Sequence, residues 1–170
     1  MHLGDGRSFS ISSLSGESDD LELPHQQFPF AGKFGRRQTG TAILSEEGEL
    51  VGAIAFSPDR TDETTCRIRY LAVRRDRQQE GIATDLVATF TDWAVDGEFE
   101  RVCIAADTPY AAVAVARAGF AYTGEVAPRG EVVFCYPGDG DTHLESALSR
   151  LLERSLPTAQ ERFIRARFES

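Results

Sequence analysis

The pattern of apolar and polar residues predicts two consecutive strand–helix units in the middle of the chain. Cys66–Val73 contains an apolar run short enough for a buried strand, and over Ile82–Val95 apolar residues recur at the spacing of one helix face. Arg101–Ala106 is a second apolar strand, and Pro109–Ala118 is a second helix that Thr108 can cap. Such units favour a parallel pair of strands joined by a right-handed crossover.

Further strands are predicted on both sides of these units. Arg7–Leu14 alternates weakly, while Thr39–Ser45 and Leu50–Ser57 are typical of a hairpin. After the second helix, Phe120–Val126 and Glu131–Tyr136 form another hairpin across a Pro-Arg-Gly turn. The outer strands are therefore expected to be antiparallel, and the fold class is α/β with a mixed central sheet.

The sequence changes character after residue 140, which divides it into a domain over 1–140 and a helical extension over 141–170. Thr142 with Glu145, and Thr158 with Glu161, predict capping boxes at the starts of two helices. The first helix carries an apolar stripe that needs a partner, either its own domain or a second copy of the chain. We favour a homodimer. The stripe consists of Leu144, Leu148, Leu151 and Leu152.

Length and hydropathy indicate a soluble protein of one-domain size. The chain has 170 residues, and no apolar run approaches the roughly 18 residues that a membrane helix needs. Its start lacks the apolar core of a signal peptide. We expect a cytoplasmic protein that does not bind membranes.

The charge balance is acidic and almost free of lysine. The net charge is −9, and Lys33 is the only lysine among 18 basic residues. This composition favours either adaptation to concentrated salt or an acidic protein from a GC-rich genome. In both cases the overall charge opposes binding to nucleic acid, because phosphates repel it.

The cysteines and histidines do not suggest a metal site or a disulfide framework. Cys66, Cys103 and Cys135 are far apart in the sequence, and all three fall in predicted strands. No histidine stands at metal-ligand spacing from another. We expect reduced thiols in the core and no bound metal.

The turn between Val73 and the helix that follows is a candidate anion site. Gly81 opens the helix, and a helix start presents free backbone N–H groups together with the positive end of the macrodipole. Arg74, Arg75 and Arg77 stand beside the turn and can meet further phosphate oxygens. The alternative is an ordinary strand-to-helix junction with exposed loop charges.

This turn resembles motif A of the GNAT acetyltransferases. That family has Gln or Arg, two residues, Gly, one residue, then Gly or Ala, which Gln78, Gly81 and Ala83 match here. A second family segment, a strand and a helix that closes on Gly-Phe, is matched by residues 101–118 and Gly119-Phe120. The resemblance implies a GNAT-like sheet with helices on both faces and the parallel strands at an acyl-CoA cleft. It also implies that residues 15–40 cover the acceptor.

The resemblance implies acetyl-CoA as co-substrate. Its pyrophosphate would lie on backbone N–H groups of residues 79–84, and its pantetheine arm beside residues 71–73. The cofactor-binding residues so implied are Leu71, Ala72, Val73, Gln78, Gln79, Glu80, Gly81, Ile82, Ala83, Thr84 and Thr108.

The catalytic residues of the family carry over less well. The family often has a glutamate on the strand where this chain has Arg67 and Arg69, and a tyrosine where Val115 stands. Tyr110, one turn earlier on the helix, and Tyr70, on the strand, are the candidate substitutes.

Two functions therefore remain open. The first is an N-acyltransferase that acetylates a small-molecule amine or a protein amino group by direct transfer in a ternary complex. The second is a noncatalytic acyl-CoA-binding sensor or interaction domain. The missing tyrosine favours the second, but the N-acyltransferase is our first interpretation and the sensor its alternative.

Overall fold

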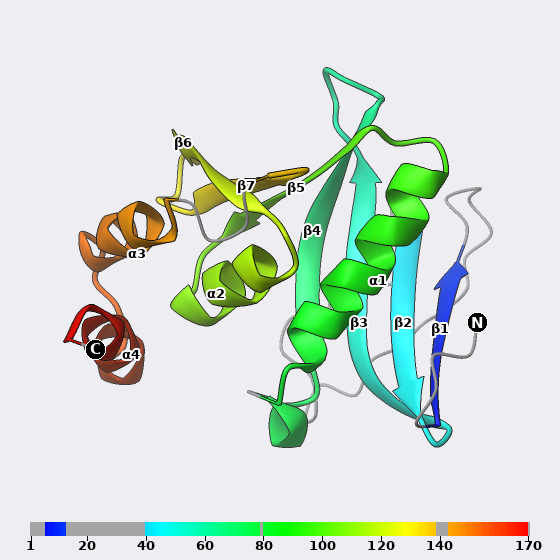
Figure 1. The fold of residues 1–170 in the computed structure, drawn as a ribbon, viewed down its shortest axis with the longest axis horizontal. Coiled ribbons are helices and arrows are strands. Elements are labelled where there is room, and N and C mark those ends of the chain that lie inside the picture. Colours follow the sequence, from blue (N-terminus) through cyan, green and yellow to red (C-terminus); the bar gives the residue numbers. More distant parts are fainter. Residues whose placement is uncertain (1–5, 13–39, 79, 139–142, 170) are drawn as a thin grey trace.

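The computed structural model describes residues 6–12, 40–78, 80–138 and 143–169, which form one sheet and the helices around it (Figure 1). The strands are β1 (Arg7–Ser12), β2 (Gly40–Glu46), β3 (Glu49–Pro58), β4 (Thr65–Val73), β5 (Arg101–Ala106), β6 (Ala121–Val126) and β7 (Val132–Tyr136). The helices are η2 (Arg75–Arg77), α1 (Ile82–Asp96), α2 (Pro109–Arg117), α3 (Leu144–Leu152) and α4 (Thr158–Glu169).

The sheet is mixed, as the sequence predicts. Its seven strands follow the order β1-β2-β3-β4-β5-β7-β6. β4 and β5 are parallel, whereas the other neighbours in the described sheet are antiparallel. The parallel pair arises because α1 crosses over between β4 and β5, while short turns join the hairpins.

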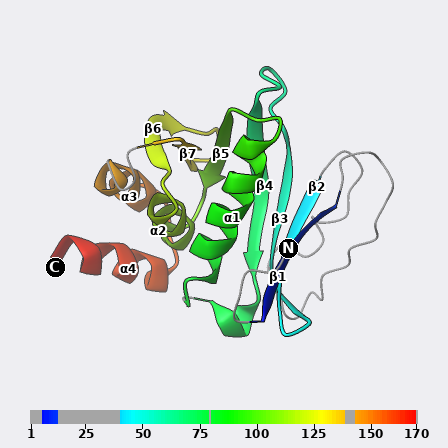
Figure 2. The same cartoon turned by 45° about the vertical axis from the view of Figure 1, so that its right-hand side comes forward.

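One large hydrophobic core fills the space between the sheet and the helices. α1 lies across β3 and β4, while α2 and α3 lie beside β5, β6 and β7 (Figures 1 and 2). All four α helices contribute buried side chains to this cluster, among them Leu86, Phe90, Val115, Leu148 and Ile164. Of residues 15–40, which the resemblance implies cover the acceptor, only Gly40 is among the described residues.

The start of α2 follows the sequence prediction, and α1 ends in a tightened turn. Thr108 accepts a hydrogen bond from the backbone N–H of Ala111 at 3.1 Å, and Gly119, just past the helix, has φ +98°. At the end of α1, Gly97 has φ −99° and ψ −122°, so it is not a left-handed cap. Its N–H instead donates to the Ala94 carbonyl at 3.2 Å, which tightens the last turn.

The leucine stripe of the tail is buried within the chain. Leu144, Leu148 and Leu151 are buried against α2, β6 and β7, and Leu152 is partly buried. The stripe therefore no longer argues for a second copy, and the homodimer stays a prediction.

The predicted capping boxes of the tail do not describe its helices. α3 begins after His143, which makes no side-chain cap hydrogen bond, and Thr142 lies outside the described residues. Thr158 is the first residue of α4, and the N–H of Glu161 donates to the Pro157 carbonyl at 3.1 Å. The second predicted cap is therefore displaced by one residue.

The expectation of three reduced cysteines is wrong for two of them. Cys103 on β5 and Cys135 on β7 form a disulfide, with their Cα atoms 4.1 Å apart. They are directly opposite partners in the antiparallel ladder, which places their side chains on the same face. Cys66 is free and buried.

Candidate functional site

The parallel strands separate halfway along β4. Their pairing joins Thr65–Ile68 to Arg101–Ile104, but β4 continues along β3 to Val73, and β5 continues along β7 to Ala106. The two strands diverge in this direction in Figure 1. The β4 edge over Leu71–Val73 therefore lies beyond the parallel ladder, where an extended ligand can add to it as a strand would.

A β-bulge marks the point of separation. In the β3–β4 register, Phe56 pairs with Ile68 and Ala55 with Tyr70, which leaves Arg69 as the extra residue. A bulge bends its strand and increases the local twist. It therefore turns the end of β4 away from β5.

The start of α1 has the geometry of an anion site. Gly81 has φ +84°, a left-handed conformation that disfavours other residues, and its carbonyl accepts the first helical bond from Asp85 N–H at 3.1 Å. The N–H groups of Ile82, Ala83 and Thr84 precede that bond and have no helical acceptor. A Cβ atom at Gly81 would meet no atom within 4 Å, so the space beside this glycine is open.

Two side chains attach this turn to its surroundings. Gln78 Nε2 donates to the Val73 carbonyl at 3.3 Å, which connects the turn to the end of β4. Thr84 Oγ1 donates to the Ala114 carbonyl on α2 at 3.3 Å, so the group it offers to a ligand is its backbone N–H. Gln79, another residue implied by the motif, lies outside the described residues.

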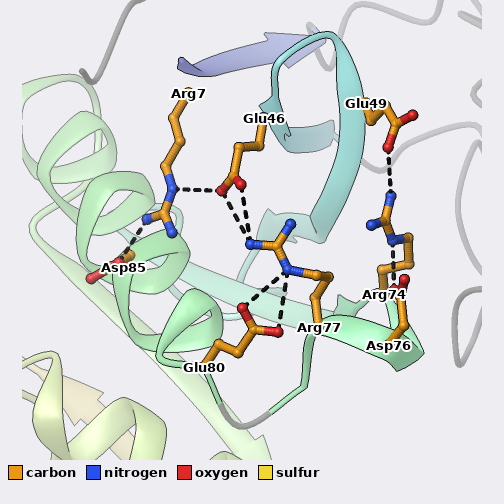
Figure 3. Close-up of polar contacts among 8 residues, drawn as sticks. All are labelled: Arg7, Glu46, Glu49, Arg74, Asp76, Arg77, Glu80 and Asp85. Carbon is orange, nitrogen blue, oxygen red and sulfur yellow. Dashed lines mark hydrogen bonds and ion pairs between the residues drawn. The ribbon is translucent and has the colours of Figure 1, made fainter. Parts of the chain in front are cut away.

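Two of the three arginines beside the turn are paired with carboxylates (Figure 3). Arg74 contacts Asp76 at 2.6 Å and Glu49 at 3.3 Å. Arg77 contacts Glu80 and Glu46, each at 3.1 Å. Exposed Arg75 has no ion pair with the described residues, which leaves it the best placed of the three to meet phosphate.

A charged network that the sequence did not reveal surrounds the same turn (Figure 3). The Glu46 carboxylate on β2 forms ion pairs with both Arg77 and Arg7. Arg7 also forms an ion pair with Asp85, in the first turn of α1, at 2.8 Å. Hydrogen bonds from Arg7 and Arg77 lower the pKa of the Glu46 carboxyl. Because Arg7 is 78 residues from Asp85 in the sequence, no local pattern signals this contact.

Tyr110, the candidate catalytic residue on α2, lies in the first turn of that helix. The ring of Tyr110 packs edge-on against Phe163 of α4, with the centroids 4.7 Å apart. Val115 is completely buried, so the position of the common family tyrosine offers no polar group. Thr108 holds the start of α2 through its side-chain oxygen.

The face of β4 opposite α1 is polar near the bulge. Arg67 contacts Asp59 at 3.0 Å, and Arg69 Nε donates to Ser57 Oγ at 2.8 Å. Hydrogen bonds from Thr61 and Arg67 lower the pKa of Asp59 to about 2. Tyr70 is partly buried on this face, in the cluster formed by Ala53, Ala55 and Ala72.

Cys66 has no features of a nucleophile. Burial raises the pKa of its thiol to about 12, so the thiol remains protonated at neutral pH and is unreactive. Among the described residues, no group of three or more His, Cys, Asp or Glu side chains is arranged to hold a metal ion. No described helix is long and apolar enough to cross a membrane.

Comparison with known proteins identifies one family and one fold. The profile of the Acetyltransferase (GNAT) family matches residues 9–120, whereas no curated protein matches the chain. A GNAT family acetyltransferase from Elizabethkingia anophelis, solved with acetyl-CoA bound, has a TM-score of 0.56 at 13% identity over 77% of this chain and 97% of its own. An acyl-CoA N-acyltransferase from Pseudomonas aeruginosa has a TM-score of 0.55 at 14% identity, over 76% and 98%.

A third solved structure shares a smaller part of the fold. The ribosomal-protein-S5-alanine acetyltransferase from Vibrio fischeri has a TM-score of 0.51 at 16% identity, over 59% of this chain and 62% of its own. At these identities the similarity concerns the fold.

Proposed function

Because the chain belongs to the GNAT acetyltransferase family, we propose that it is an N-acyltransferase that moves an acetyl group from acetyl-CoA to an amine. The observation that carries this proposal is the combination of two features at the end of β4. The strand edge over Leu71–Val73 lies beyond the parallel ladder, and the free N–H groups at the start of α1 follow it after one short turn. Together they match an elongated ligand with an amide-containing arm and a diphosphate.

In this proposal the backbone holds the cofactor. The pyrophosphate lies on the N–H groups of residues 79–84, where the helix dipole favours negative charge. The pantetheine amides hydrogen-bond to Leu71, Ala72 and Val73 as an added strand. Gln78 supports the turn between the two sites, and Thr108 keeps the start of α2 beside the thioester. The acetyl-CoA bound by the Elizabethkingia structure supports the assignment.

The transfer needs no metal and no covalent enzyme intermediate. The lone pair of the neutral amine attacks the thioester carbonyl, a C–N bond forms, and the C–S bond breaks with its electron pair on sulfur. The attacking nitrogen loses a proton to water or a base, and the CoA thiolate takes up a proton. A backbone N–H near Val73 is the proposed donor to the oxyanion of the tetrahedral intermediate.

Tyr110 and Tyr70 are the proposed sources of the proton for the thiolate. Tyr110 lies in the first turn of α2, where the helix dipole also stabilises the thiolate itself. Tyr70 lies at the bulge where β4 and β5 separate. Tyr110 is our first choice, because Tyr70 belongs to the face opposite the helices.

The buried valine at position 115 favours a second candidate function, an acyl-CoA sensor without turnover. It has the same cofactor site and lacks the family's common acid. A cytoplasmic location and a homodimer remain predictions, and disulfides such as Cys103–Cys135 are rare in reducing compartments.

Release of free CoA thiol distinguishes the two candidates. Purified protein is mixed with acetyl-CoA and a panel of small amines and peptides, and mass spectrometry then shows which acceptors have gained an acetyl group. An acyltransferase releases one thiol for each acetylated product. Acetyl-CoA binding without thiol release across the panel would favour the sensor, and absence of binding would contradict both.

A further inference from the structure

Two arginines of β4 lie on the side of the strand that faces away from α1, and a third, in the loop before the strand, is close enough for its charge to act on one of them. Arg67 and Arg69 lie on the strand itself, and Arg60 lies in the loop that precedes it. The chain as a whole carries a net charge of −9, so a basic cluster here runs against the overall balance. Asp59 is the carboxylate that Arg67 contacts within the cluster.

The bulge fixes which face these side chains occupy. Ile68, before the bulge, and Val73, after it, belong to the core under α1. Arg69 reaches Ser57 on the opposite face, and Tyr70 packs there beside Ala53 and Ala55. The anion site at the start of α1 lies on the helix side, so the two faces of β4 offer separate approaches to the point where the strands separate.

Among the described residues, neither Arg69 nor Arg60 has a carboxylate as ion-pair partner, and of the two only Arg69 lies on β4, at the bulge. Arg67 is paired with Asp59 at 3.0 Å, whereas Arg69 donates to the neutral hydroxyl of Ser57 at 2.8 Å. Partial desolvation, followed by the charges of Arg67 and Arg60, lowers the pKa of the exposed Arg69 guanidinium, although the nearby Asp59 carboxylate acts in the opposite direction. An added anion would relieve this repulsion, and the planar guanidinium matches a carboxylate in two-point contact.

We propose that Arg69 binds a carboxylate on the acceptor, so that the acceptor is an amine that also carries a carboxylate group. This inference rests on the proposed acyltransferase function and specifies its substrate class. The cofactor phosphates lie on the α1 side of the sheet. The acceptor approaches from the other side, and Arg69 holds its acid group while its amine meets the thioester.

Matched pairs of acceptors test the proposal in the wild-type protein. L-lysine with cadaverine, L-ornithine with putrescine, and L-phenylalanine with phenethylamine differ only in the carboxylate. We expect kcat/KM for acetylation to be at least tenfold higher for the acid of at least one pair. A peptide with one glutamate and its glutamine analogue, included as a fourth pair, tells a free amino acid from an acidic peptide as the source of the carboxylate.

Arg69→Gln should remove the preference by raising KM for the acid and leaving the neutral amine unchanged. Arg69→Lys keeps the positive charge but loses the planar guanidinium, so it should retain part of the preference for the acid. Arg162 is an exposed arginine on α4, and Arg162→Gln is the matched control, which should retain the whole preference for the acid. If the melting curve shows that Arg69→Gln is unfolded, Arg69→Lys and the comparison of acceptor pairs in the wild-type protein still test whether Arg69 binds the carboxylate.

Equal or better use of the neutral amines by the wild-type protein would overturn the proposal, as would a preference that survives in Arg69→Gln. Either result leaves the acyltransferase function standing, because acetylation has then been measured. Failure of the function itself gives a different result, namely no thiol release with any acceptor, and that result also removes this inference.

Discussion

At the scale of single residues, arginines within one strand and the following turn have different roles because different groups face them. Arg67, Arg74 and Arg77 are held by carboxylates and tie segments together. Arg69 donates to a hydroxyl, and the like charges of Arg67 and Arg60 outweigh the nearby carboxylate of Asp59. The residue type alone does not distinguish a structural arginine from a binding one, but its partners do.

The role proposed for Tyr110 can be tested with a change of one atom. Tyr110→Phe keeps the ring that packs against Phe163, so stability should change little. If the hydroxyl protonates the thiolate, turnover should fall roughly tenfold to a hundredfold, with acetyl-CoA affinity unchanged. Steady-state kinetics and a binding titration measure the two quantities. Wild-type turnover would leave water or Tyr70 as the donor, and Tyr70→Phe is the companion variant.

The low pKa of Asp59 predicts a loss of stability in acid. Its folded-state pKa of about 2 lies below the ordinary value of 3.8. The stability that it contributes is therefore complete above about pH 4 and is lost as the pH falls towards 2. The drop in melting temperature from pH 4 to pH 2 should be larger for the wild-type protein than for Asp59→Asn. Equal losses in the two proteins would contradict the assignment.

At the scale of elements, local signals predicted most of the fold, and long-range contacts account for what they missed. Thr108 and Gly119 mark both ends of α2 because caps act within a few residues. The Cys103–Cys135 bond and the contact of Arg7 with Glu46 depend on which strands pair and in which register. No spacing in one sequence fixes that register, so the disulfide and the charged network were beyond prediction.

The same limit applies to the candidate site. Gln78, Gly81 and Ala83 form a local motif, and the structure places Gly81 at the start of α1 in a left-handed conformation, with the other two residues beside it. The bulge at Arg69 is visible only from the β3–β4 pairing. The packing of Tyr110 against Phe163 requires the tail to fold back onto α2, which its leucine stripe alone does not determine.

The disulfide between β5 and β7 predicts one free thiol in the denatured, unreduced chain, from Cys66, and three after reduction. Closing a loop between cysteines 32 residues apart should contribute about 3 to 4 kcal/mol to stability by restricting the unfolded chain. A reducing agent should therefore lower the melting temperature of the wild-type protein.

The double variant Cys103→Ala/Cys135→Ala is the control for that experiment. Its melting temperature should be lower than that of the wild-type protein and should not change when the reducing agent is added. Three free thiols without reduction would show that the two cysteines are not joined.

At the scale of the whole molecule, the acidic surface predicts a response to salt. Carboxylates outnumber basic residues 27 to 18, and their repulsion is screened in molar salt, where the Debye length is about 3 Å. If the composition is an adaptation to salt, the melting temperature should rise steeply from dilute buffer to concentrated potassium chloride. A flat response would favour the genomic explanation for the excess of arginine over lysine.

The most direct measurement of the central claim is a calorimetric titration of the protein with acetyl-CoA, in the wild type and in Gly81→Asp. The substitution places a negative charge in the proposed phosphate site. Affinity should fall at least tenfold, about 1.4 kcal/mol. Gly124→Asp is the matched control, because Gly124 also has a positive φ, +89°, and open space around its Cβ position, but lies on β6. The affinity of Gly124→Asp for acetyl-CoA should equal that of the wild type. Unchanged affinity in a folded Gly81→Asp protein, or no binding by the wild type, would contradict the assignment of the site.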